Sequence, residues 1–335
     1  MTTAYISHPD FLKHEMGRHH PECPERIQAI EDQLIQSRLD AYLKRIDPPL
    51  ATEEDVTRVH SHDHFDFIKS KAPSTGYAMI DGDTIMNTAT WNTSLRAAGA
   101  AIAAVDAVMK GEVNNAFCAV RPPGHHAEPH RSMGFCVFNN VAIATRYAIE
   151  KYGLRRVAVI DFDVHHGNGT EAAFIDDPHV LMCSFFQHPF YPYSGLEGGD
   201  NMVNVPLPAS TNGKVVRDIK QCAVAVGHLA VQCQQVVIDV PGGHRHVDAR
   251  EQLHRALRRW RHRIRTHPPR DDADRHDDGA RRAEERQALI LRGEHRVPDR
   301  RRAVRRQLEN HRPRASLEGR PRKEARGEQP CRCAE

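Results

Sequence analysis

Residues 156–169 read RVAVIDFDVHHGNG, and the pattern of this stretch is the strongest indication of the fold class. Residues 156–162 form an almost continuous apolar run, of the kind found in strands that are buried on both faces of a parallel sheet. From Asp161 onward the stretch carries two carboxylates, two imidazoles and two glycines. In open α/β sheets, binding sites form at the carboxyl ends of the strands. The stretch therefore predicts a parallel α/β fold with a polar site at one sheet edge.

On either side of this stretch, segments with helical and with strand-like patterns alternate along residues 1–240. Apolar spacing, with proline starts and glycine stops, predicts helices over residues 24–39, 93–109 and 139–152. Short apolar runs predict further strands over residues 115–120, 179–186 and 235–240. Residues 1–10 look polar and irregular. Alternating strands and helices predict a parallel sheet that helices cover on both faces.

The composition changes near residue 240. Residues 1–240 hold 20 Lys or Arg and 28 Asp or Glu, whereas residues 241–335 hold 27 and 16, so the sign of the charge reverses. No Phe follows Phe190 and no Tyr follows Tyr193. We therefore divide the chain into a first domain, residues 1–240, and an Arg-rich segment, residues 241–335.

Three interpretations of this Arg-rich segment are open. It could be a basic tail that binds nucleic acid, an intrinsically disordered region, or sequence that is foreign to this fold. It has too few large apolar residues to offset the entropy of ordering a chain, which favours the last two interpretations. We accordingly expect no nucleic-acid partner.

We identify no targeting signal in the sequence. Residues 1–10 do not resemble a signal peptide, and no window approaches the run of about 18 apolar residues that a membrane helix needs. The eight cysteines lack paired spacing, apart from Cys331 and Cys333. Free thiols are typical of a reducing compartment. We expect a soluble cytoplasmic protein without a membrane partner.

A first polar cluster follows the expected strand at residues 115–120. Residues 121–127 read RPPGHHA, so a rigid Pro-Pro-Gly turn precedes His125 and His126. Because the two residues are adjacent on a backbone fixed by this turn, we expect their rings to point in different directions. A lone histidine at such a place is more often structural, whereas a pair at a strand exit gains weight from the residues that accompany it.

A second cluster consists of Asp161, Asp163 and His165. Alternation along an extended chain places these three side chains on one side. A carboxylate and an imidazole two residues apart suit Zn²⁺. The structural alternative is an Asx-rich turn that caps a helix beginning near Thr170. Burying so much charge without a metal would be costly, which favours the metal site.

These motifs together resemble a known family. HPECPER (residues 20–26), RPPGHHA, GFCVFNNVAIA (residues 134–144) and VIDFDVHHGNGTE (residues 159–171) are similar to the zinc-dependent histone deacetylase and acetylpolyamine amidohydrolase family. The class II-like branch is the most similar, because Asn168 stands where class I members usually have Asp. The resemblance extends over residues 5–240. It implies a three-layer arginase/deacetylase-like α/β fold with a central parallel sheet.

The resemblance implies a zinc site beside a general base. Asp163 and His165 resemble two of three protein ligands of the zinc ion. His126 resembles the base that activates a water molecule and later protonates the leaving amine. The implied reaction is hydrolysis of acetyl or other acyl amides of lysine side chains, in proteins or peptides, or of acetylpolyamines.

Further residues are implied as partners of the base. His125 resembles its electrostatic partner, hydrogen-bonded to Asp161, and Asn168 resembles the residue that orients His126. The resemblance also implies a monovalent-cation site, for K⁺, at Asp161, Asp163, His165, Ser184 and Phe185.

A narrow substrate tunnel is implied as well. Phe135 and Tyr191 resemble its two aromatic walls, although ordinary core packing would explain them without the motifs. Gly134 would line the tunnel and leave room for an aliphatic stem. Asp81 or Asp83 resembles a carboxylate at the rim that grips the substrate backbone.

The sequence departs from the family after residue 240. The family has a third zinc ligand, an Asp in a Ser-Ala-Gly-Phe-Asp segment, and by spacing this position falls on His244. Asp239 and Asp248 are alternatives. The family also has a Tyr in a Glu-Gly-Gly-Tyr segment that helps to stabilise the oxyanion, and here that Tyr is absent.

Three explanations of this departure compete. His244 could be a genuine ligand, or the protein could be an inactive, zinc-bound homologue that binds acyl-lysine. A shift of reading frame between Lys214 and Pro241 is the explanation we favour, because a GC-rich gene read out of frame yields Arg, Pro, Ala and His. A dimanganese hydrolase of the arginase type is a further alternative, against which RPPGHH and the aromatic tunnel argue.

Overall fold

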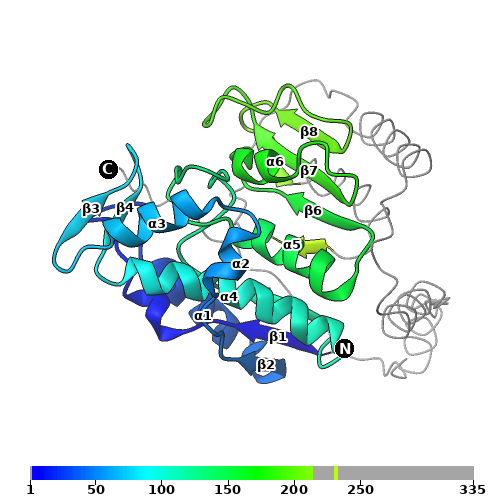
Figure 1. Cartoon of the computed structure of the whole chain (residues 1–335). Coiled ribbons are helices and arrows are strands. Elements are labelled where there is room, and N and C mark those ends of the chain that lie inside the picture. Colours follow the sequence, from blue (N-terminus) through cyan, green and yellow to red (C-terminus); the bar gives the residue numbers. More distant parts are fainter. Residues whose placement is uncertain (1, 214–229, 233–335) are drawn as a thin grey trace, which may run out of the picture. The chain divides into compact units, whose positions relative to one another are not determined.

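The computed structural model describes residues 2–213 and 230–232, which belong to one compact unit of the chain (Figure 1). Its strands are β1 (Thr3–Ile6), β2 (Leu43–Ile46), β3 (Tyr77–Met79), β4 (Ile85–Asn87), β5 (Asn115–Cys118), β6 (Val157–Asp161), β7 (Val180–Gln187), β8 (Met202–Leu207) and β9 (Ala230–Gln232). Its helices are α1 (Glu25–Gln36), α2 (Glu53–Thr57), α3 (His62–Lys71), α4 (Thr90–Met109), α5 (Asn140–Tyr152) and α6 (Asn168–Phe174), with 3₁₀ turns η1 (Pro9–Leu12) and η2 (Asp40–Tyr42).

The described strands form two parallel sheets and one short antiparallel pair. One parallel sheet has the order β2-β1-β5 and the other the order β8-β7-β6-β9, while β3 pairs with β4. Every neighbouring pair in the first two sheets is parallel. The predicted α/β fold with parallel strands between helices is confirmed, although the described residues form two parallel sheets where we expected one.

β1 is a buried central strand, so the interpretation of residues 1–10 as irregular is wrong. Tyr5 faces Phe11 and α1, whereas Ala4 and Ile6 face Ala100 of α4. Helices therefore cover both faces of this sheet. Four residues are too few to show a periodic pattern in the sequence, and the long-range pairing with β2 and β5 decides their conformation.

The second sheet is also buried on both faces. All five residues of β6 are buried, as are the first seven of the eight in β7. Val159 of β6 and Met182 of β7 share a core cluster with Phe174 of α6 and Val141 of α5. This burial explains why β6 reads as a continuous apolar run rather than as an alternating one.

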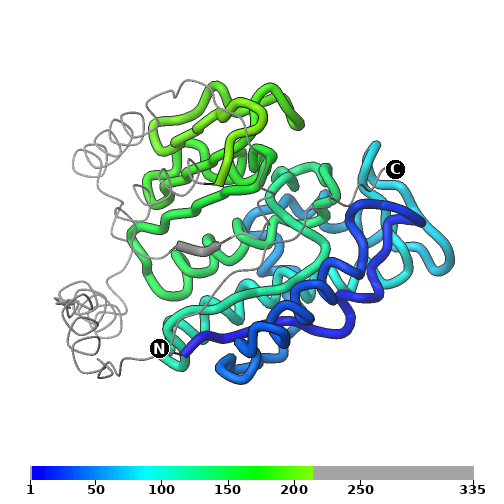
Figure 2. The backbone as a smooth tube through the Cα atoms, turned by 180° about the vertical axis from the view of Figure 1, so that it is seen from behind, coloured from blue at the N-terminus to red at the C-terminus, as the bar shows by residue number. Residues whose placement is uncertain are grey.

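Small side chains bring helices α4 and α5 close together. Ala101 and Val105 of α4 pack against Ala144 and Ala148 of α5. α4 also covers the sheet that contains β1, and α5 packs against β6, so this helix pair contacts both parallel sheets (Figures 1 and 2).

The predicted elements fall close to the observed ones. The helices expected over residues 24–39, 93–109 and 139–152 are α1, α4 and α5, and the strands expected over 115–120, 156–162 and 179–186 are β5, β6 and β7. The expected strand at residues 235–240, the division at residue 240 and the Arg-rich segment lie outside the described residues.

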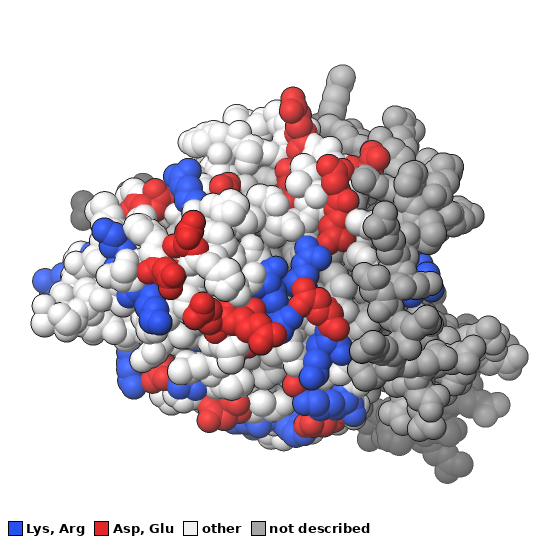
Figure 3. Space-filling view, viewed as in Figure 1, with Lys and Arg blue, Asp and Glu red and all other residues white. Residues whose placement is uncertain are grey.

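The described helices and surface charges bear on the kind of partner that the protein can have. No helix within the described residues is long and apolar enough to cross a membrane. On the face seen in Figure 3, acidic and basic side chains stand next to one another, so the acidic balance of residues 1–240 does not gather into one patch there.

Candidate functional site

The two polar clusters of the sequence meet at the carboxyl ends of β5 and β6. The chain leaves β5, runs through the Pro-Pro-Gly turn and places His125 beside Asp161, the last residue of β6. His125 Nδ1 lies 2.8 Å from Asp161 Oδ2, and both residues are buried. Backbone contacts fix this junction further, because the Thr170 N–H donates to the His125 carbonyl over 3.1 Å.

His125 is held as a cation by its neighbours. Burial by itself would lower the pKa of His125, but the Asp161 and Asp163 carboxylates outweigh burial and raise it to about 9. At neutral pH the imidazolium of His125 therefore forms a buried ion pair with Asp161.

His126 is held in the opposite state. Its ring centroid lies 4.0 Å from that of His125, and its Nδ1 lies 2.8 Å from Asn168 Oδ1. Burial, together with the nearby His125 charge, lowers the pKa of His126 to about 2. The two adjacent histidines thus differ in charge because carboxylates outweigh burial at His125, whereas burial and the His125 charge prevail at His126.

Asp163 and His165 lie side by side just beyond β6. The His165 N–H donates to Asp163 Oδ1 over 2.7 Å, and His165 Nδ1 lies 3.1 Å from the same oxygen. Burial opposes the ionisation of Asp163, but His125 and His165 outweigh it and lower the pKa of this carboxyl.

Two such donors suit one tetrahedral zinc ion. The donor types fit Zn²⁺, which proteins bind through His nitrogen and Asp oxygen atoms, and His165 Nδ1 lies 3.1 Å from Asp163 Oδ1. Within residues 2–213 and 230–232, no group of three or more His, Cys, Asp or Glu side chains is arranged to hold a metal. The predicted third ligand, His244, and its alternatives Asp239 and Asp248 lie outside the described residues.

Aromatic rings surround His126 and His165. Tyr191 stands edge-on to both rings, with centroid distances of 5.1 and 5.8 Å. Phe190 stacks on His165 at 5.0 Å with an interplanar angle of 5°. The sequence interpretation singled out Tyr191 but missed Phe190, its neighbour in the same HPFYP segment.

The other predicted wall, Phe135, follows Gly134 in a tight turn. Both residues have positive φ, 59° at Gly134 and 68° at Phe135, and the ring of Phe135 packs edge-on against His20 at 4.6 Å. A Cβ atom on Gly134 would overlap the His126 ring. Glycine is therefore needed here for its backbone conformation and because it lies against His126.

The two candidate rim carboxylates have different surroundings. Asp83 Oδ1 accepts the Gly134 N–H over 2.9 Å, and burial together with this carboxylate raises the pKa of Tyr191. Asp81 instead pairs with the exposed side chain of Arg131 at 3.1 Å. Of the two, Asp83 is the one that contacts residues of the predicted tunnel.

Three residues of the predicted cation site, Asp161, Ser184 and Phe185, lie on the neighbouring strands β6 and β7, and Asp163 and His165 follow just beyond β6. Asp161 of β6 is directly opposite Ser184 of β7, and Ser184 and Phe185 are buried. Ser184 Oγ lies 3.0 Å from Nδ1 of the buried His166, which the sequence interpretation did not assign.

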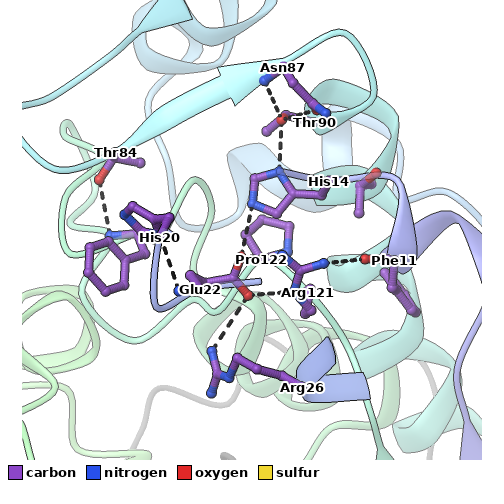
Figure 4. A network of polar contacts seen from close by, with 12 residues as sticks. Phe11, His14, His20, Glu22, Arg26, Thr84, Asn87, Thr90, Arg121 and Pro122 are labelled. Carbon is purple, nitrogen blue, oxygen red and sulfur yellow. Dashed lines mark hydrogen bonds and ion pairs between the residues drawn. The ribbon is translucent and has the colours of Figure 1, made fainter. Parts of the chain in front are cut away.

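A buried ion pair anchors the histidine segment at its start (Figure 4). The Arg121 guanidinium donates to both carboxylate oxygens of Glu22, at 2.6 and 2.5 Å, and to the Phe11 carbonyl at 2.6 Å. His14 Nε2 lies 3.4 Å from Glu22 Oε2. Glu22 of the HPECPER segment thus binds Arg121, the residue that precedes the Pro-Pro-Gly turn. The sequence interpretation quoted both segments but did not pair them.

Comparison with known proteins identifies the family. The model of the histone deacetylase domain matches residues 20–246 of this chain. The chain belongs to the histone deacetylase family. Members of this family generally depend on zinc.

Several curated relatives carry related names. A protein of Archaeoglobus fulgidus named "Probable deacetylase" is 38% identical over 220 residues, which are 63% of this chain and 60% of that protein. The histone deacetylase-like amidohydrolase of Pseudomonas aeruginosa is 39% identical over 56% of this chain and 51% of its own length. The polyamine deacetylase HDAC10 of Rattus norvegicus is 38% identical over 59% of this chain and 36% of its own length. The chain thus spans 36–60% of these three relatives.

A solved structure supports the same histone deacetylase fold. The HD domain of HDA15 superimposes with a TM-score of 0.63 at 29% identity, over 68% of this chain and 69% of that domain. The parallel strands and flanking helices described above are therefore those of a histone deacetylase domain.

Proposed function

We propose that this protein is a zinc-dependent deacetylase that hydrolyses acetyl or similar acyl amides of lysine side chains or polyamines. The observation that carries the proposal is the histidine pair, in which His125 binds Asp161 and His126 binds Asn168. The names of the relatives, which include a polyamine deacetylase and an amidohydrolase, support the reaction class.

Asp163 and His165 are the described residues that would hold Zn²⁺, with His244 as the sequence-based candidate for a third ligand. When bound, Zn²⁺ would polarise the amide carbonyl and lower the pKa of a water molecule. We also propose that a K⁺ site lies near Asp161 and Ser184.

The histidine pair would perform the proton transfers. Neutral His126 would donate an Nδ1–H to Asn168, whose Oδ1 lies 2.8 Å away, and Nε2 would then be free to accept a proton from the attacking water. The His125 cation lies beside it and disfavours a lasting charge on His126. The proton on Nε2 therefore passes readily to the leaving amine nitrogen.

The aromatic residues would select a slender substrate. Tyr191 and Phe135 would flank an acyl-lysine or acyl-amine chain, and Asp83 would hold the turn that carries Gly134 and Phe135. We further propose a cytoplasmic location, as the sequence suggests.

The test combines metal analysis with turnover by the full-length chain. We expect stoichiometric zinc and hydrolysis of a fluorogenic acetyl-lysine peptide or of an acetylpolyamine. Asp163→Asn should lose zinc, whereas His126→Gln should retain zinc and lose turnover. A chain that neither binds zinc nor turns over any of these substrates would contradict the proposal.

The sequence favours one competing function. No Tyr follows Tyr193, so the tyrosine that completes the family's oxyanion site is missing from this chain. A zinc-bound protein that binds acyl-lysine without hydrolysing it is consistent with that absence. Stoichiometric zinc and saturable binding of an acetyl-lysine peptide, without turnover, would identify this second function.

A further inference from the structure

Asn168 makes contacts at both ends of its side-chain amide. Its Oδ1 lies 2.8 Å from His126 Nδ1, while its Nδ2 donates to Glu128 Oε1 over 2.8 Å and to Met133 Sδ over 3.4 Å. Glu128 is half-buried and follows His126 by two residues on the same segment. The amide of Asn168 therefore bridges two side chains of one backbone stretch.

An amide in this position has two orientations that differ by a flip. With its oxygen towards His126, the imidazole must donate from Nδ1, and a neutral ring then has no proton on Nε2. With its NH₂ group towards His126, the imidazole must accept at Nδ1, and a neutral ring then carries its proton on Nε2. Only the first orientation leaves a base at Nε2.

Glu128 distinguishes the two orientations. An ionised carboxylate has acceptors and no donors, so it attracts the NH₂ group of Asn168 and repels its oxygen. The thioether of Met133 is a weak acceptor and favours the same orientation less strongly. An aspartate at position 168 would need no such help, because both of its oxygens accept.

The backbone holds Glu128 in place. Its N–H donates to the Arg131 carbonyl over 2.8 Å, and the Arg131 N–H returns a bond over 3.3 Å, which closes a tight turn. On the other side, Asn168 is the first residue of α6, and its N–H donates to the His166 carbonyl over 3.0 Å. Backbone hydrogen bonds thus fix both Glu128 and Asn168 at positions where their side chains meet.

We propose that Glu128 is a positioning residue that fixes the orientation of the Asn168 amide and thereby the Nδ1–H tautomer of His126. Within the described residues, the Glu128 carboxylate is hydrogen-bonded to Asn168, so Glu128 acts on His126 through that amide. The role rests on the proposed function of His126 as a base, but the tautomer itself is a property of the resting protein.

The test reads the tautomer directly by long-range ¹H–¹⁵N correlation spectra of the full-length protein labelled at its histidine rings. The signals of His126 are identified as those that His126→Gln removes. In the parent protein we expect the pattern of an Nδ1–H, Nε2-unprotonated ring. If the parent shows Nε2–H at His126, the proposal is wrong whatever the variants do.

Two variants then test the part played by Glu128. Glu128→Gln keeps the shape but offers both a donor and an acceptor, so we expect the Nδ1–H signal to weaken and an Nε2–H form to appear. Combining Glu128→Gln with Asn168→Asp should restore the Nδ1–H form, because the introduced carboxylate only accepts and the introduced amide can donate to it. A merely structural role predicts no such rescue.

Met133→Leu is the matched control. It removes the second acceptor of the Asn168 NH₂ group and should leave the tautomer unchanged. An unaltered His126 pattern in Glu128→Gln, or a failure of the double variant to restore the Nδ1–H form, would overturn the proposal. Because none of these spectra requires turnover, they remain informative even if the chain proves not to be a deacetylase.

Discussion

Arg121 and Glu22 form a bidentate ion pair in which both side chains are almost completely buried, 2% and 0% exposed. Burial opposes the charge on Glu22, but contacts with His14 and Arg121 outweigh it and lower the pKa of this carboxyl. The pair joins the loop before α1 to the segment that carries the two histidines. Removing one partner should therefore affect both segments.

Glu22→Gln should destabilise the protein strongly. The substitution keeps the shape of the side chain but leaves the Arg121 charge buried without its counter-charge, which typically costs about 3–5 kcal/mol of unfolding free energy. Urea denaturation followed by circular dichroism measures the loss. Glu25→Gln, at an exposed position three residues along, is the control and should leave stability almost unchanged. Equal effects of the two substitutions would contradict the prediction.

His60 should make the protein labile in acid. Burial, with a smaller effect of His64, lowers the pKa of His60 to about 3. The unfolded chain takes up a proton near pH 6.5, whereas the folded chain does so only near pH 3. The contribution of neutral His60 to the unfolding free energy is therefore fully present above pH 6.5. It is lost as the pH drops towards 3, by up to about 1.4 kcal/mol per pH unit.

His60→Gln should remove this dependence. In the parent protein, the Asn139 N–H donates to His60 Nε2 over 2.9 Å. The side-chain oxygen of glutamine can accept the same N–H. Between pH 3 and 6.5, the slope of the unfolding free energy against pH should decrease by the amount that corresponds to the uptake of about one proton on unfolding. His62→Gln, at a side chain that is 74% exposed, should leave the slope unchanged. An unchanged slope in His60→Gln would show that other groups cause the acid lability.

Gly134→Ala should be more damaging than Gly153→Ala. Both glycines have φ near +60°, but a Cβ at Gly153 would meet nothing within 4 Å, whereas one at Gly134 would overlap the His126 ring. The Gly153 variant isolates the backbone strain, which costs about 1–2 kcal/mol. Any further loss in the Gly134 variant, measured by thermal or urea unfolding, reports the contact with His126. Equal losses of stability in the two variants would mean that the turn at Gly134 can shift away from His126 at little cost.

The nucleotide sequence of the gene tests the reading-frame explanation. We expect that a single-base correction between the codons of Lys214 and Pro241 restores a Gly-Phe-Asp and a Gly-Gly-Tyr segment. The corrected chain should then contain the third zinc ligand and the missing tyrosine of the family. If neither segment occurs in any frame, the composition change after residue 240 needs another explanation.

The spacing of apolar residues predicted those helices and strands whose sequences show a regular pattern. β6 is buried on both faces and therefore reads as an apolar run, and α4 and α5 carry helical spacing with a glycine after each. β1 escaped prediction because its four residues show no period. Its conformation depends on pairing with β2 and β5, which lie far away in the sequence.

The site was predictable to the extent that motifs mark it. The family resemblance led to His125, His126, Asp161 and Asn168, which the structure brings together. Glu128 stands in the same motif region, yet its part depends on where the Asn168 amide points, and spacing carries no information on that. The pairing of Glu22 with Arg121 likewise arises from folding, since 99 positions separate the two residues.

The placement of the site across two sheets has a mechanical consequence. Among the described residues, His125 follows a strand of one sheet and Asp161 ends a strand of the other, so their hydrogen bond joins two separately paired sets of strands. The alanine-rich contact of α4 with α5 links a helix that covers the first sheet to a helix that packs against the second. Widening that contact with a larger side chain would displace the histidine pair relative to its carboxylate and amide partners. We therefore expect the geometry of the histidine pair to depend on small side chains being kept where α4 meets α5.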